Sequence, residues 1–102
     1  MNDEIFDKIY LAIEKNGKHK KYRVSYAMEN DLDDIALKGK VKIIFDEFYS
    51  SEILVNPSYL DLVVVANDMI NVCDFHDHIY LENIIFVEKN DDVNIYTMSF
   101  GS

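Results

Sequence analysis

The chain has 102 residues, enough for one domain with one modest core. Apolar residues make up 49% of the chain, which is typical of a folded protein and not of a disordered one, and the single cysteine excludes an internal disulfide. The formal net charge of −9 is uneven, because residues 1–28 carry a net +2 and residues 29–102 a net −11. We therefore expect a single acidic domain, residues 1–102, whose surface repels nucleic acid and anionic lipid.

The chain begins without the basic start and apolar run that mark a secretory signal. Its longest apolar run, residues 62–66, is far shorter than the roughly 20 residues of a membrane span. A lone cysteine is typical of a reducing compartment. These features predict a cytoplasmic protein that does not contact a membrane.

Residues 2–16 can be interpreted in two ways. Asn2 as a cap, two acids in the first turn and Gly17 at the end favour a helix. The alternation of Ile9, Leu11 and Ile13 before the pair Asn16–Gly17 instead favours the first strand of a hairpin. We expect the helix and keep the strand as the alternative.

Two strands are expected next, over residues 20–28 and 40–48, because both segments are rich in aromatic and β-branched side chains. The acidic stretch at residues 29–34 separates them as a turn, and residues 49–55 read as irregular or as a short edge strand.

Residues 56–73 predict an apolar, buried helix. Asn56 is a suitable cap and Pro57 suits the first helical position, since proline lacks only an N–H that has no partner there. Few polar residues follow, so most of the helix circumference is apolar.

Residues 78–89 and 93–100 predict an antiparallel hairpin around a turn at residues 90–92. Strict alternation places Leu81, Ile85 and Val87 on one face, and Ile84 with Phe86 on the other. The order α-β-β-α-β-β predicts a small α+β domain, with two helices on a mostly antiparallel sheet of about four strands.

The stretch NVCDFHDHIYLEN, residues 71–83, carries the densest chemistry. If it is extended, Asp74, His76 and His78 lie on one side with Tyr80 and Glu82, and could hold zinc or another divalent ion. A Cys73–His76 pair would instead suggest nucleophilic chemistry. We expect neither, but a helix end followed by a polar turn, in which His76 or His78 meets helix carbonyls. A role in a partner interface is a further alternative. We expect no cofactor, and keep a metal-binding enzyme or module as the alternative.

The acidic surface supplies the leading hypothesis, a non-enzymatic interaction protein that binds a basic partner. By charge and size, though not by motif, the chain resembles small acidic bacterial or phage inhibitors, including immunity and anti-defence proteins, which would block a nuclease or nucleic-acid-binding protein. A homodimer through the hairpin aromatics Tyr80, Phe86, Tyr96 and Phe100 is a further possibility. The candidate partner-binding residues are Asp31, Asp33, Asp34, Asp46, Glu47, Glu52, Asp74 and Asp77.

Overall fold

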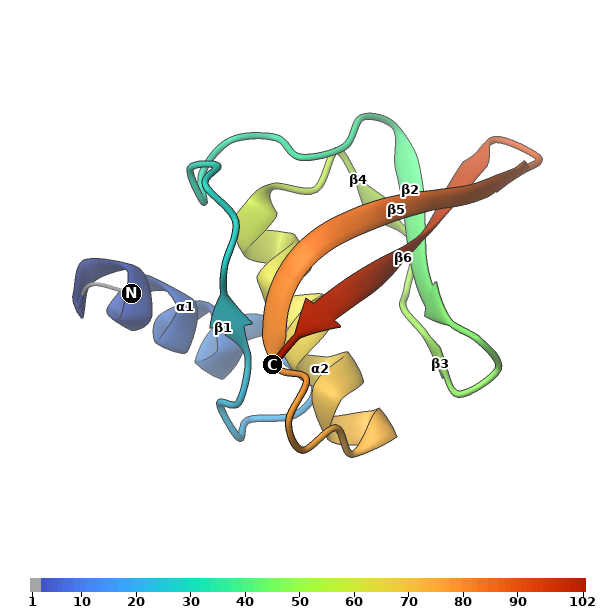
Figure 1. The fold of residues 1–102 in the computed structure, drawn as a ribbon. Helices are drawn as coiled ribbons and strands as arrows, with labels where there is room; N and C mark the ends of the chain where they lie inside the picture. Colours follow the sequence, from blue (N-terminus) through green and yellow to red (C-terminus); the bar gives the residue numbers. More distant parts are fainter. Residues whose placement is uncertain (1–2) are drawn as a thin grey trace.

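Figure 1 shows the computed structural model of the chain, which describes residues 3–102. Two helices pack on a mixed sheet of six strands, so the α+β class is confirmed. The elements are α1 (Asp3–Asn16), β1 (Ser25–Tyr26), β2 (Lys40–Phe45), β3 (Tyr49–Ser50), β4 (Leu54–Val55), α2 (Tyr59–Cys73), β5 (Tyr80–Asn90) and β6 (Val93–Gly101).

The helical interpretation of the first segment is confirmed, and the strand alternative is wrong. The proposed cap, Asn2, lies outside the described residues. At the other end, the Gly17 N–H donates to the Ile13 carbonyl at 2.8 Å, and Lys20 Nζ donates to the Glu14 carbonyl at 2.8 Å. A cation on the last carbonyls stabilises the negative end of the helix dipole.

The second helix begins later than predicted. Its cap is Ser58, whose hydroxyl accepts from the Asp61 N–H at 3.1 Å while the Asp61 carboxylate accepts from the Ser58 N–H at 3.0 Å. Asn56 instead accepts from the Gly39 N–H at 2.6 Å, and the Pro57 carbonyl accepts from Ala36. The buried helix itself is confirmed. Its predicted start was wrong because Asn56 and Pro57 bond to the chain before β2.

The sheet has more strands and more parallel pairing than predicted. Its order is β1-β5-β6-β2-β3, and β4 also pairs with β2. The β5–β6 hairpin inserts between β1 and β2, so the β1–β5 and β6–β2 pairs are parallel. Helix α2 forms the connection between β4 and β5, and such a long crossover permits parallel neighbours.

The first predicted strand, residues 20–28, reduces to two residues. The backbone before β1 bonds to side chains of α2 instead of to a strand. Asn67, which is fully buried, accepts from the N–H groups of Arg23 at 2.8 Å and Val24 at 3.1 Å. The Asn67 side chain also donates to the Lys21 carbonyl at 2.9 Å. The neighbouring Asp68, 5% exposed, accepts from the His19 N–H at 3.0 Å.

The predicted hairpin is confirmed, with a turn at Asp91, whose φ is 57°. The predicted common face of Ile84 and Phe86 is confirmed, since they pair with Met98 and Tyr96, but the predicted face of Leu81 is wrong. The register shifts between Leu81 and Asn83, and again between Phe86 and Glu88, so Leu81 pairs with Phe100 and Ile84 with Met98. A bulge at one residue reverses the alternation beyond it, and Leu81 and Ile84 therefore share the inner face.

The core lies between α2 and the inner face of the sheet. Leu62, Met69 and Ile70 of α2 are fully buried, as are Ile43 of β2 and Leu81 of β5. Helix α1 lies beside α2 (Figure 1). Its buried residues Ile9 and Ile13 belong to the same core. Across residues 3–102, neither helix is long and apolar enough to cross a membrane.

Candidate interaction site at the end of the second helix

The dense stretch at residues 71–83 is the end of α2 and a polar turn, and not an extended strand. Asp74 is in the left-handed region, with φ 55° and ψ 47°, and its N–H donates to the Ile70 carbonyl. The Phe75 N–H donates to the same carbonyl at 3.0 Å. The two amides after Cys73 thus occupy the Ile70 carbonyl, one of the helix-end carbonyls that the histidines were expected to meet. The predicted common face of Asp74, His76 and His78 is wrong, because β5 begins only at Tyr80.

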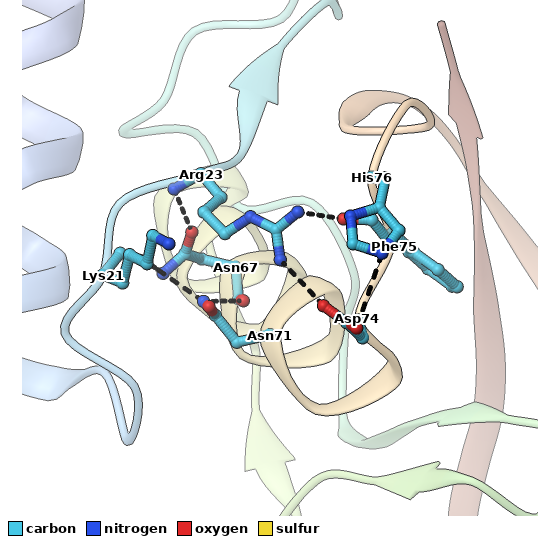
Figure 2. A network of polar contacts seen from close by, with 7 residues as sticks. All are labelled: Lys21, Arg23, Asn67, Asn71, Asp74, Phe75 and His76. Carbon is cyan, nitrogen blue, oxygen red and sulfur yellow. Dashed lines mark hydrogen bonds and ion pairs between the residues drawn. The ribbon is translucent and has the colours of Figure 1, made fainter.

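Arg23 holds this turn in place (Figure 2). Its Nη2 donates to the Phe75 carbonyl, and its Nη1 lies 3.8 Å from the Asp74 carboxylate. The Asn67 bond to the Arg23 backbone fixes the base of that side chain. One residue therefore ties the segment before β1 to the turn after α2.

Three phenylalanines from separate segments meet beside this turn. The rings of Phe45 and Phe75 lie 5.1 Å apart edge to face, and those of Phe75 and Phe100 lie 5.7 Å apart. They border a cavity of about 340 Å³, which we call the aromatic hollow, with lining residues Phe45, Phe75, His78, Met98, Ser99 and Phe100. The lining comes mainly from the end of β2, the turn after α2 and the inner face of β6.

Sequence reasoning missed the aromatic hollow because its phenylalanines lie far apart in the chain. The available signal was the pairing of an aromatic with an acid, in Phe45–Asp46 and in Asp74–Phe75.

All eight candidate acids are exposed, and four of them lie in the two chain segments that bring Phe45 and Phe75 to the aromatic hollow. Asp46, Asp74 and Asp77 each adjoin a lining residue in the chain, and Glu47 follows Asp46. The charge of Asp46 also raises the pKa of Cys73, after burial as the main cause, which places Asp46 near the end of α2. We call Asp46, Glu47, Asp74 and Asp77 the acidic rim.

The other four acids lie elsewhere. Asp31, Asp33 and Asp34 share the turn between β1 and β2, where Asp33 forms an ion pair with Lys8 of α1. Glu52, between β3 and β4, pairs with Lys18 at 3.1 Å. The structure therefore divides the candidates into the acidic rim, the 31–34 turn and an isolated Glu52.

The basic segment at residues 15–23 is largely engaged within the chain. Lys18 pairs with Glu52, Lys20 caps α1 and Arg23 holds the turn after α2. Much of its charge is therefore directed at carboxylates and carbonyls of the same molecule.

The two histidines of the dense stretch do not converge. His76 Nε2 lies 3.5 Å from the Asp74 carboxylate, whereas His78 lines the aromatic hollow. Within residues 3–102, no three His, Cys, Asp or Glu side chains are grouped closely enough to hold a metal ion. The metal hypothesis for His76, His78 and Asp74 remains a prediction.

The metal hypothesis predicts near-equimolar zinc or a similar ion in protein purified without a tag, released when both His76 and His78 are replaced by alanine. Because only His76 and Asp74 approach each other, we expect a clearly substoichiometric metal content by elemental mass spectrometry. A near-equimolar ion that the double alanine variant loses would contradict this expectation.

The surroundings of Cys73 do not favour an activated nucleophile. Burial raises the pKa of its thiol, and the negative charge of Asp46 raises it further. Activated cysteines require a lowered pKa, because the thiolate is the reactive form. The Cys73–His76 interpretation therefore receives no support from the electrostatics of this site.

Tyr49 should make the fold sensitive to alkali. Burial raises the pKa of its phenol well above the usual 10, and the charge of Asp68 adds to the effect. Since the folded state favours the neutral phenol, this contribution to stability is complete below about pH 10 and falls as the pH rises beyond it. We expect Tyr49→Phe to lessen the loss of stability above pH 10, measured as the urea midpoint against pH. If the urea midpoint of Tyr49→Phe falls with pH as steeply as that of the parent protein, the role assigned to Tyr49 is contradicted. Tyr26, whose pKa is raised to about 12, leaves some dependence on pH in both proteins.

The four hairpin aromatics do not form one surface. Phe100 borders the aromatic hollow, and Tyr96 packs against the core with its ring 5.4 Å from that of Phe86. Tyr80 and Phe86 are exposed, as are Ile85 and Val87.

Comparison of the chain with models of protein families, with curated proteins and with solved structures found no match.

Proposed function

We propose that the chain is a small acidic, non-enzymatic interaction protein that inhibits a basic partner, of the immunity or anti-defence type. The observation that supports this proposal is the acidic rim beside the aromatic hollow. Protein interfaces commonly combine an apolar centre with a polar, charged surround. The proposed setting is the cytoplasm, and the proposed interaction needs no cofactor.

The proposed mechanism has two stages. Acidic side chains first steer a basic nuclease or nucleic-acid-binding protein toward the surface, which raises the association rate at low ionic strength. The chain then occupies the surface with which the partner binds phosphate. The acidic rim makes the contact in this scheme, whereas Asp31, Asp33, Asp34 and Glu52 contribute to the long-range field.

The test begins with partner capture at low salt on the immobilised protein. The affinity of the purified partner is then measured at several ionic strengths, together with its nucleic-acid binding. We expect affinity to weaken by about tenfold or more as the Debye length shortens from ~10 Å to ~3 Å. We also expect stoichiometric inhibition of nucleic-acid binding. Affinity that is the same at low and high salt, or a partner that still binds nucleic acid in the complex, would count against the proposal.

Self-association through β5 is a second candidate, favoured by the exposure of Ile85, Phe86 and Val87. Beyond Leu81, no described strand pairs with the outer edge of β5. Exposed apolar edges favour pairing with another strand. We expect native mass spectrometry to detect a dimer that Ile85→Lys abolishes if this candidate is correct. A monomer at all concentrations would exclude it.

A further inference from the structure

We propose that the aromatic hollow receives one large apolar side chain of the basic partner, with cationic residues on both sides of that side chain meeting the acidic rim. This inference rests on the proposed function and specifies the chemistry of the partner segment. It describes an aromatic or long aliphatic anchor flanked by arginine or lysine.

The shape and lining of the hollow favour an apolar anchor. Its volume of about 340 Å³ is at the lower end of the range for small-molecule pockets, and three phenylalanine rings and the Met98 side chain border it. Burying an aromatic side chain among rings gains both apolar area and edge-to-face contacts. Such an anchor in a pocket is the usual centre of an interface hot spot.

Charge complementarity specifies what surrounds the anchor. Between Ile43 and Glu88 the chain has no lysine or arginine, and all four rim acids lie in that interval. Arg23, which reaches this end of α2, is directed at Asp74 and at the Phe75 carbonyl. Asp46, Glu47 and Asp77 have no ion pair with any lysine, arginine or histidine among residues 3–102. They can therefore pair with cations of a partner.

Peptide probes test the inference without the natural partner. The first probe is a short synthetic peptide with one tryptophan between pairs of arginines. In the second, glycine replaces the tryptophan, and in the third, glutamates replace the arginines. Because the chain contains no tryptophan, the peptide indole reports its own burial by fluorescence. We expect calorimetry to give affinities about tenfold or more weaker for the second and third probes, and a blue-shifted emission for the first.

Two sets of variants locate the binding. Phe75→Ala should abolish the emission shift, and the double variant Asp46→Asn, Asp77→Asn should weaken binding several-fold and flatten its salt dependence. The matched control Asp31→Asn, Asp34→Asn removes the same charge from a turn that contributes only to the long-range field. It should weaken binding of the first probe clearly less than the rim double variant does, and an equal loss would contradict the assignment of the contact to the rim. If Phe75→Ala does not fold, nuclear Overhauser contacts between the indole and the Met98 methyl group in the parent protein decide the location.

The outcomes separate this inference from the proposed function. Equal affinity for the tryptophan and glycine probes, or an indole that does not contact Met98, would overturn the anchor. Equal affinity for the arginine and glutamate probes would overturn the flanking cations. If Phe75→Ala binds and inhibits a captured basic partner as well as the parent protein does, the role of the hollow is overturned and the proposed function stands. If the probe binds at the hollow but the chain inhibits no basic partner, only the proposed function is overturned.

Discussion

Replacing Asn67 with alanine is expected to lower the free energy of unfolding by about 3–5 kcal/mol, since each buried polar group left without a partner costs about 1–3 kcal/mol. The fully buried Asn67 amide serves the N–H groups of Arg23 and Val24 and the carbonyl of Lys21. Alanine leaves two donors without their acceptor and creates a cavity beside the core. For a domain of this size the melting temperature should fall by about 4–8 °C per kcal/mol.

Asn71→Ala is the matched control for Asn67. Asn71 lies one helical turn further on and also donates to the Lys21 carbonyl, at 3.1 Å, but it is only partly buried. Water can replace its contacts, and we expect a loss of about 1 kcal/mol. Urea unfolding followed by circular dichroism measures both variants, with an unchanged denaturant slope indicating a change in stability alone. Losses of equal size would show that burial of Asn67 contributes little.

Replacing Arg23 with alanine is expected to lower stability by about 2 kcal/mol, within the range of hydrogen bonds to charged groups. The larger effect should be local. Without the guanidinium, the Phe75 carbonyl and the Asp74 carboxylate lose their shared partner (Figure 2). Amide hydrogen exchange should therefore accelerate in residues 75–79, which follow α2, by more than in the central turns of α2.

Arg23→Lys separates charge from geometry in the same test. An ammonium group can replace the charge near Asp74, but it lacks the planar arrangement that reaches a carbonyl and a carboxylate together. We expect intermediate stability and intermediate exchange rates. The same variants should weaken binding at the aromatic hollow, because the turn carries Phe75. Exchange in residues 75–79 that is unaltered in Arg23→Ala would contradict the role assigned to this side chain.

The elements that sequence patterns predicted well are those whose hydrogen bonds are local. Helix α1 and the β5–β6 hairpin form bonds within a short stretch of chain, and their patterns are visible there. Residues 20–24 have the composition of a strand, yet their backbone partners are Asn67 and Asn71, more than 40 residues away. Local composition cannot reveal such partners.

Two local features were not predicted correctly, the start of α2 and the inner face of β5. The Ser58-x-x-Asp61 pattern is a capping box, and it marks the start of α2 better than Asn56 and Pro57 do. The bulge at Glu82 reversed the inner face of β5, and period-two reasoning fails wherever a strand contains an extra residue. The eight candidate acids were correctly placed on the surface, because isolated charges are rarely buried.

The contacts of α2 with residues 18–24 have a consequence for the order of folding. Those contacts join residues 43 to 50 positions apart, so the backbone groups of residues 18–24 that bond to Asn67 and Asp68 lack their native partners until α2 is formed and placed. Loop closure over such a distance favours late ordering. Residues 18–24 should therefore join after the rate-limiting step, and damage to the Asn67 contacts should appear mainly as faster unfolding, with the folding rate nearly unchanged.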